Sequence, residues 1–241
     1  MKPIAIIPAR YASTRFPGKP LVLISGKPMV QHVYERCSCC FDLVVVATDD
    51  ARIEEAVKAF GGQVIMTSPD HPSGTDRCAE AALKLAENHQ FDVVVNVQGD
   101  EPFIKKEQLE SIIQCFDQPE TDIATLLTPI HSAEMLFDPN KVKAVRAVNG
   151  NALMFSRQPL PYQRDVLKSA WLENHQYFLH LGLYAYRSDV LQRITKLEQS
   201  PLEVAEKLEQ LRWLENGFIL KTAIVTHGNV GIDTPEDLEY L

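Results

Sequence analysis

The sequence predicts an α/β protein of three layers, in which helices cover both faces of a mostly parallel central sheet. Three observations favour this class. Strand-like and helix-like segments alternate through the first half of the chain, the strand-like segments are continuous Val/Ile runs, and helix signals bound them. A strand that is apolar at every position has both faces buried, which is typical of a parallel sheet between helices.

The elements of the first half follow from these signals. Pro28 suits the first turn of a helix, where no backbone N–H is needed, and Gly61-Gly62 supplies a left-handed helix end. We therefore expect strands at residues 4–9, 43–48, 63–67 and 92–98, and helices at 28–40, 50–60, 75–88 and 105–116.

The pattern changes after residue 120 or so, where strand-like segments follow one another with little helix between them. Strands are expected at 122–130, 142–148, 152–156 and 177–186, then helices at 188–197 and 202–215, a strand at 219–225 and a short helix from Thr234. The arrangement indicates a mixed β excursion over roughly 120–190. Because repeats, low-complexity tracts and linkers are not seen, we expect a single domain over 1–241.

Composition and charge narrow the function. The net charge of −8 argues against nonspecific nucleic-acid binding, which needs a basic surface. The apolar run at 4–7 is too short for a signal peptide, and no run approaches the ~18 apolar residues of a membrane span, so a cytoplasmic protein is expected. The cysteines are five, an odd number. Cys37-x-x-Cys40 falls within an expected helix, which favours small buried side chains over a redox or metal role.

The loop after the first strand gathers three cations, Arg10, Arg15 and Lys19. It matches neither the Walker A pattern nor GxGxxG. Its small residues Ala9, Ala12 and Ser13 would let a phosphate approach the backbone N–H groups. A triphosphate cradle and an ordinary solvated loop are equally supported by spacing alone.

Two carboxylates are candidates for holding a divalent cation. Asp100 follows the strand at 92–98 and Gly99, at the sheet edge where open α/β sheets bind ligands. Asp233 precedes a helix start that Thr234, Pro235 and Asp237 already satisfy, which leaves its carboxylate free. Mg²⁺ takes one or two carboxylates together with phosphate oxygens and water.

Three further segments have weaker signals. Ser73, Thr75 and Arg77 could meet a nucleotide, but helix capping is the favoured interpretation. The strand at 177–186 has Leu179, Leu181, Leu183 and Ala185 on a core face and His180, Gly182, Tyr184 and Tyr186 on a polar, aromatic face. That second face suits a sugar-sized ligand or a half-exposed strand. By helical periodicity alone, Glu209 and Gln210 face solvent.

Taken together, the segments resemble the family of 3-deoxy-manno-octulosonate (Kdo) cytidylyltransferases, also called CMP-Kdo synthetases. The resemblance spans the chain and is carried by IIPARYASTRFPGKPL (6–21), SGTDR (73–77), NVQGDEP (96–102), HLGLYAYR (180–187), LEQLR (208–212) and GIDTPEDL (231–238). It implies a Rossmann-like fold similar to that of sugar nucleotidyltransferases, and a homodimer joined through the 120–190 excursion. Family members usually continue the last helix further beyond Thr234 than this chain does.

The resemblance also implies the roles of individual residues. CTP would be bound by Ala9, Arg10, Ser13, Arg15, Lys19, Ser73, Thr75 and Arg77. The sugar acid would be bound by Gln98, Arg164, His180, Tyr184, Glu209 and Gln210. Asp100 and Asp233 match the Mg²⁺ ligands, and Asp100, Asp233, Lys19 and Arg10 would be the catalytic set.

The reaction so implied is attack of the anomeric 2-hydroxyl of Kdo on the α-phosphorus of CTP, which gives CMP-Kdo and pyrophosphate for lipopolysaccharide synthesis. An amino-sugar analogue of Kdo is an alternative acceptor. Two other classes compete with this reading. A metal-dependent glycosyltransferase would carry Asp-x-Asp after a strand, whereas Asp49-Asp50 and Asp100-Glu101 lack that spacing. A nucleotide-sensing module would bind CTP without turnover.

Overall fold

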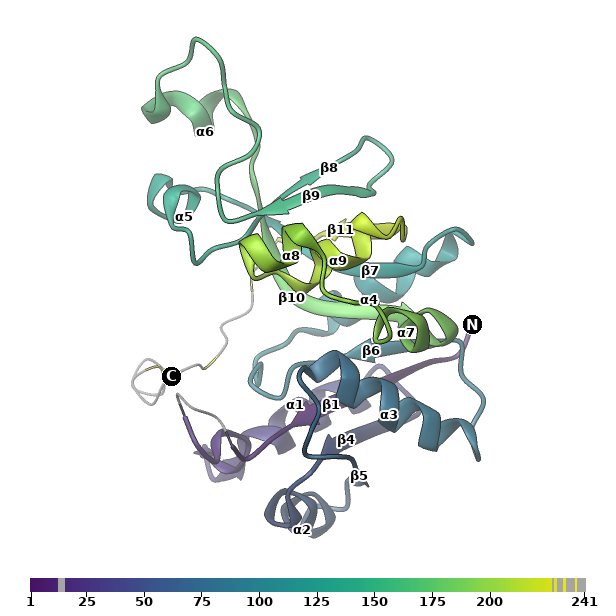
Figure 1. Ribbon diagram of the computed structural model, residues 1–241. Coiled ribbons are helices and arrows are strands. Elements are labelled where there is room, and N and C mark those ends of the chain that lie inside the picture. The colour runs from purple at the N-terminus through teal and green to yellow at the C-terminus, as the bar shows by residue number, and fades with distance from the viewer. Residues whose placement is uncertain (13–15, 227, 229–231, 233–236, 238–241) are drawn as a thin grey trace. The chain divides into compact units, whose positions relative to one another are not determined.

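The computed structural model describes residues 1–12, 16–226, 228, 232 and 237 (Figure 1). The chain divides into two compact units, which are described separately. Unit 1 comprises residues 1–110, 183–195 and 229–241, and unit 2 comprises 111–182 and 196–228. Helix α4 (Lys106–Gln114) and strand β10 (Phe178–Arg187) each contribute residues to both units. The helix expected from Thr234 lies outside the described residues.

Unit 1 contains a parallel sheet in the order β6-β1-β4-β5, which confirms the expected mostly parallel α/β class. Its strands are β1 (Pro3–Ala9), β4 (Val44–Thr48), β5 (Gln63–Met66) and β6 (Val93–Asn96). Every residue of β4 and β6 is buried, as the continuous Val runs predict. Beside β6, the end of β10 runs antiparallel, with Tyr184 opposite Asn96.

Four helices belong wholly to unit 1, and each begins and ends close to its expected bounds: α1 (Met29–Ser38), α2 (Ala51–Ala59), α3 (Gly74–Ala86) and α7 (Ser188–Ile194). Both α1 and α3 pack against β1 and β4. Asp50 caps α2 by accepting a hydrogen bond from the Arg52 N–H at 2.9 Å. At its far end, Gly61 has φ +78°, the left-handed stop that the sequence predicts.

A small hairpin in unit 1 was not predicted. The 3-10 helix η1 (Lys19–Leu21) leads into β2 (Leu23–Ile24), which pairs with β3 (Lys27–Pro28). The two turn residues, Ser25 and Gly26, have φ of 49° and 83°. Positive φ at both central positions matches the twist of a two-residue hairpin, but a Ser-Gly pair is a weaker signal than Asn-Gly.

Unit 2 is mixed, as the change of pattern after residue 120 predicts. Strand β11 (Leu220–Ile224) runs parallel to β7 (Ile123–Pro129), while β8 (Lys143–Arg146) is antiparallel to β9 (Ala152–Ser156) and to the start of β10. The short helical elements of this unit are η2 (Cys115–Asp117), α5 (Ala133–Phe137), η3 (Lys168–Ala170) and α6 (Trp171–Asn174). The segment between β9 and β10 contains η3 and α6, with Trp171 buried against Tyr177.

The single helix expected at 202–215 is wrong, because two helices occupy this stretch. Helix α8 (Pro201–Glu206) ends at Lys207, which has the left-handed angles φ 55° and ψ 48°, and α9 (Glu209–Glu215) starts two residues later. The break changes the phase of the helix, so Gln210 is only 5% exposed and Val204 is 48% exposed. The periodicity argument that placed Gln210 in solvent is therefore wrong.

The cysteines behave mostly as small apolar side chains. Cys37, Cys78 and Cys115 are buried, and burial raises the pKa of each of the Cys37 and Cys115 thiols, that of Cys115 to about 11. Helix α1 ends before Cys40, so the CxxC lies across a helix end and not within a helix. Within the described part of the chain, no helix has both the length and the apolar character that crossing a membrane requires.

Candidate functional site

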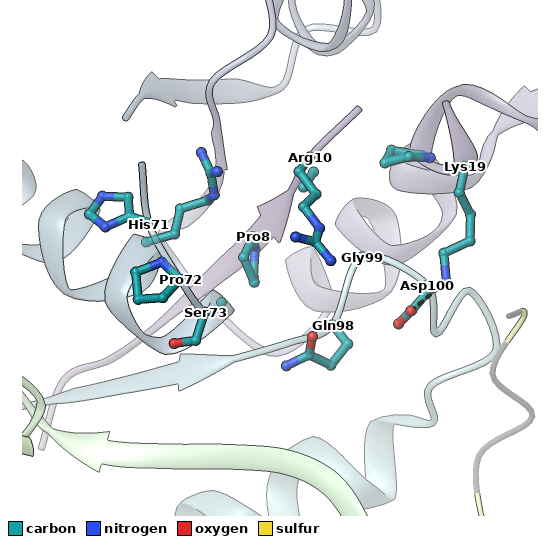
Figure 2. A pocket seen from close by; sticks show the side chains of 13 residues that line it. Pro8, Arg10, Lys19, His71, Pro72, Ser73, Gln98, Gly99 and Asp100 are labelled. Atoms are coloured by element: carbon teal, nitrogen blue, oxygen red, sulfur yellow. Dashed lines mark hydrogen bonds and ion pairs between the residues drawn. The ribbon is translucent and has the colours of Figure 1, made fainter. Parts of the chain in front are cut away.

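A cavity of about 230 Å³ opens in unit 1 where β1 and β6 end and α3 begins (Figure 2). This is the carboxyl edge of the parallel strands, where open α/β sheets bind ligands. Seven of the residues predicted for nucleotide, sugar or metal binding line it: Ala9, Arg10, Lys19, Ser73, Arg77, Gln98 and Asp100. Residues that are far apart in sequence are thus brought to one place.

The segment after β6 approaches β1 closely because it contains a glycine. The Val97 N–H donates to the Ile6 carbonyl at 3.0 Å, which continues the pairing of β6 with β1 past the end of the strand. A Cβ on Gly99 would lie 3.0 Å from the carbonyl oxygen of Pro8. Such a contact is against backbone, so any side chain at this position would push the two segments apart. Gly99 therefore sets where the next residue, Asp100, is held.

Lys19 and Asp100 form an ion pair in the wall of the cavity, with Nζ 2.6 Å from Oδ2. The same ammonium donates to the Ile232 carbonyl at 2.7 Å, and the Ile232 N–H donates to the Asp100 carbonyl at 3.1 Å. The side chain of Lys19 is 13% exposed and that of Asp100 is 35% exposed. The Asp100 carboxylate is therefore anchored and still open to a ligand.

Arg10 supplies a second cation and is held less tightly. It is exposed, and Figure 2 shows its guanidinium directed toward Gln98 and Gly99. The loop between Arg10 and Lys19 is fixed at its far end, where the Gly18 N–H donates to the Tyr11 carbonyl at 2.9 Å and Gly18 has φ +72°. Two cations thus border one small cavity, an arrangement that suits an anion.

Ser73 confirms the capping interpretation that the sequence favoured. Its Oγ accepts from the Asp76 N–H at 3.2 Å and donates to the Asp76 carboxylate at 2.6 Å, so it closes the start of α3. Arg77 is 4% exposed, donates to Thr67 Oγ1 at 2.6 Å, and lies 3.3 Å from an Asp49 carboxylate oxygen. Both residues still line the cavity, while Thr75 is buried and does not.

His71 belongs to the cavity wall and escaped the sequence analysis. Its Nε2 contacts the Glu80 carboxylate, which also accepts from the Ser68 N–H at 2.9 Å. Partial burial opposes ionisation of Glu80, but hydrogen bonds from Lys84, Ser68 and His71 outweigh it and lower the pKa of Glu80 to about 2. The sequence around His71 does not indicate this pairing, because the partner, Glu80, lies in helix α3 and is brought close only by the fold.

Three predicted site residues, Ser13, Arg15 and Asp233, lie outside the described residues. Across the part of the chain that is described, His, Cys, Asp and Glu do not gather in groups of three or more that could hold a metal ion. A closed all-protein metal cage is therefore not seen there. Mg²⁺ needs only one or two carboxylates when phosphate oxygens and water complete its shell, so the half-open Asp100 carboxylate fits such an ion.

Comparison with known proteins agrees with the geometry. The sequence pattern of the cytidylyltransferase family matches residues 4–224. A 3-deoxy-manno-octulosonate cytidylyltransferase from Phocaeicola vulgatus is 58% identical, over 99% of this chain and 95% of its own length. One from Parabacteroides distasonis is 57% identical over 99% and 96%. This chain belongs to the 3-deoxy-manno-octulosonate cytidylyltransferases.

The fold agrees with that membership. A CMP:2-keto-3-deoxy-manno-octonic acid synthetase solved in complex with CTP is 46% identical and superposes with a TM-score of 0.91, over 100% of this chain and 96% of that one. The resemblance proposed from the sequence motifs is therefore confirmed at the level of family and fold.

The residues predicted for the sugar-acid site divide between the units. Gln98 and Tyr184 are in unit 1, where Gln98 Nε2 donates to Asn96 Oδ1 at 3.2 Å and Tyr184 is 9% exposed. Tyr184 stacks on Tyr186, with ring centroids 6.1 Å apart. The prediction of a half-exposed strand is wrong at its end, because Tyr186 is fully buried.

In unit 2, His180 is held as a neutral ring. Its Nε2 lies 3.0 Å from Thr125 Oγ1 and its ring meets the Phe155 ring edge-on at 4.9 Å. Burial lowers the pKa of His180 to about 3. At neutral pH this side chain is therefore uncharged.

The other three residues of unit 2 that are predicted for the sugar site differ in how firmly they are held. Arg164 is 91% exposed and pairs with its neighbour Asp165 at 3.4 Å. Gln210 is buried and Glu209 is half-buried at the start of α9. Helix α9 is fixed to α8 by Arg212, whose Nε and NH2 donate to the two Glu203 carboxylate oxygens at 2.8 and 2.7 Å.

Proposed function

We propose that the cavity of unit 1 binds the triphosphate of CTP together with Mg²⁺, while this cytidylyltransferase transfers CMP from CTP to the anomeric 2-hydroxyl of Kdo. The products are CMP-Kdo, used in lipopolysaccharide synthesis, and pyrophosphate. The observation that carries the proposal is the pairing of Lys19 with the half-open Asp100 carboxylate beside Arg10, at the carboxyl edge of the sheet.

The roles of the side chains follow from their charges. Lys19 and Arg10 neutralise the negative charge that moves onto pyrophosphate as it leaves, and Lys19, which is already held by Asp100 and Ile232, does so with little reorganisation. Asp100 holds Mg²⁺ against the nucleotide, and Asp233 is the second carboxylate of the proposal. Mg²⁺, when bound, supplies positive charge at the α-phosphate and lowers the pKa of the attacking hydroxyl.

The protein needs no covalent intermediate for this reaction. The sugar hydroxyl attacks the α-phosphorus in line, so catalysis rests on positioning and on charge stabilisation. The neutral His180, with Gln98, Arg164, Tyr184, Glu209 and Gln210, is proposed to bind the sugar acid. Burial of Gln210 and fixation of α9 by Glu203 support that assignment, because a recognition site needs side chains held in one rotamer.

Pyrophosphate release separates this function from its rivals. The purified protein is incubated with CTP, Mg²⁺ and either Kdo or its amino-sugar analogue, and pyrophosphate is assayed. Pyrophosphate release that requires the sugar acid supports the proposal. The acceptor with the higher kcat/KM is then the native acceptor. CTP binding without release would indicate a nucleotide-sensing module, and consumption of a nucleotide sugar would indicate a glycosyltransferase.

Assembly and location complete the proposal. We infer a homodimer joined through the excursion at 120–190, because four large apolar side chains of this segment, Val148, Leu153, Tyr162 and Leu167, are each at least 60% exposed and would be covered in such a contact. Size-exclusion chromatography with light scattering measures the molar mass in solution, and the mass of a monomer would rule the dimer out. Five free cysteines support the cytoplasm, where thiols stay reduced.

A further inference from the structure

Ile232 belongs to an apolar cluster that includes residues from both segments that carry the charged residues of the cavity. Its side chain is fully buried in a cluster with Ile24 and Met29, and the partly buried rings of Phe16 and Phe103 complete that cluster. Phe16 lies in the loop that joins Arg10 to Lys19, and Phe103 lies just after Asp100. The apolar cluster that holds Ile232 therefore also includes one residue from the loop after β1 and one from the loop after β6.

The backbone of the same residue bonds to both members of the ion pair. Ile232 donates its N–H to the Asp100 carbonyl at 3.1 Å, and its own carbonyl accepts from Lys19 Nζ at 2.7 Å. Lys19 Nζ in turn donates to Asp100 Oδ2 at 2.6 Å. These three hydrogen bonds form a closed ring through Lys19, Asp100 and Ile232, which is called the circuit below.

A circuit of this kind fixes side chains that would otherwise move. A lysine carries its ammonium on a flexible four-carbon stem, so a single partly exposed ion pair holds it in place poorly. A second, fixed acceptor removes that freedom, and the Ile232 carbonyl is such an acceptor because the side chain of the same residue is buried in the apolar cluster. The burial of Ile232 therefore determines how precisely Lys19 and Asp100 are placed.

We propose that Ile232 is a positioning residue, which sets the geometry of Lys19 and Asp100 without touching substrate. This inference rests on the proposed function in treating those two as site residues. Truncating Ile232 is expected to release the circuit, and so to weaken divalent-metal binding and lower kcat. The conservative Ile232→Val, which keeps a branched apolar side chain, is expected to retain most of both.

The matched control is Ile53→Ala in α2. Ile53 is also fully buried in unit 1, and Ile→Ala removes the same atoms there. Its N–H donates within its own helix, to the Asp50 carbonyl at 3.1 Å, and not to the cavity. A variant at Ile53 therefore reports the cost of a lost core side chain alone.

The experiment compares wild type, Ile232→Ala, Ile232→Val, Ile53→Ala and Asp100→Asn. Thermal melting measures stability, hydrogen exchange of the residue 232 amide in the metal-free protein measures the Asp100 bond, and EPR measures Mn²⁺ binding to the protein–CTP complex. Ile232→Ala is expected to lose amide protection and to bind Mn²⁺ about tenfold more weakly, which is the size of loss that follows removal of a residue that orients a metal ligand. Ile53→Ala should melt earlier while leaving the other two measurements unchanged.

Equal Mn²⁺ affinity and equal amide protection in Ile232→Ala and Ile53→Ala would overturn the inference, since Ile232 would then be an ordinary core residue. Unchanged Mn²⁺ binding in Asp100→Asn would instead remove the metal assignment in the proposed function. In that case the hydrogen exchange of the residue 232 amide still tests the positioning role of Ile232. If the amide stays protected in Ile232→Ala, the role is contradicted, and if protection is lost, the role is supported.

Discussion

Lys19 Nζ lies 2.6 Å from Asp100 Oδ2, so a cation already occupies one oxygen of the carboxylate that we propose as a metal ligand. The two residues are brought together from the loop after β1 and the loop after β6, which are neighbours only because those strands pair in parallel. The pair shows how the edge of the sheet brings opposite charges together.

Asp100→Asn is expected to lower kcat by at least ~100-fold, a loss of about 3 kcal/mol of transition-state stabilisation. The amide keeps the shape of the carboxylate but loses the charge that a divalent cation needs. Steady-state pyrophosphate release measures the loss. Asp42→Asn, at an exposed position, is the control for removing one negative charge, and a near-normal rate for Asp100→Asn would remove this residue from the metal site.

Gly99→Ala is expected to lower kcat by about tenfold or more, because a displacement of even 1 Å at a reacting centre is costly. The new Cβ would lie 3.0 Å from the Pro8 carbonyl oxygen and must push Asp100 away. Gly74→Ala is the control, since its Cβ meets Pro8 at 3.4 Å, an ordinary contact in the same cavity. Equal activity in the two variants would show that the close approach does not place Asp100.

The stability of the protein is expected to fall as the pH drops below 6.5, because of His180. Its folded pKa of about 3 lies below the unfolded value of about 6.5, so the unfolded chain binds a proton that the folded chain does not. The contribution of the neutral ring is fully present above pH 6.5. It is lost toward pH 3, with a slope of up to about 1.4 kcal/mol per pH unit.

Urea unfolding at several pH values checks this prediction. Between pH 6.5 and 5 the slope should flatten in His180→Gln, whereas the exposed His89→Gln serves as control for the loss of a histidine. Below pH 4.5 a second loss of stability is expected from Glu80. Its pKa is about 2 in the folded protein and about 4.5 in the unfolded chain, so the unfolded chain takes up the proton at a higher pH than the folded protein does. An unchanged slope in His180→Gln would contradict the burial argument.

Lys207→Gly is expected to raise the free energy of unfolding by about 0.5–1 kcal/mol, because a Cβ makes the left-handed region unfavourable. Lys207 has φ 55° at the break between α8 and α9 and is exposed. Lys207→Ala keeps the Cβ and serves as the comparison, with no gain expected. Denaturant titration measures both, and equal stability of the two variants would show that the break is unstrained.

Much of the fold followed from local patterns. Local signals predicted several elements to within a few residues. They are the Val runs of β4 and β6, the helix cap at Asp50 and the left-handed helix end at Gly61. The helix break at Lys207 was not predicted, because a lysine gives no signal for positive φ. Tertiary packing of α8 and α9 through the Glu203–Arg212 pair overrides the local preference there.

By itself, the sequence determined the order of the elements, the position of Asp100 after a buried strand and the family to which the motifs belong. Only the tertiary structure decided which partners those residues have: Lys19 for Asp100, Glu80 for His71, and Asp49 with Thr67 for Arg77. The reason is physical. Periodicity, capping and turn chemistry depend on neighbours along the chain, whereas ion pairs and burial depend on which distant segments the sheet brings together.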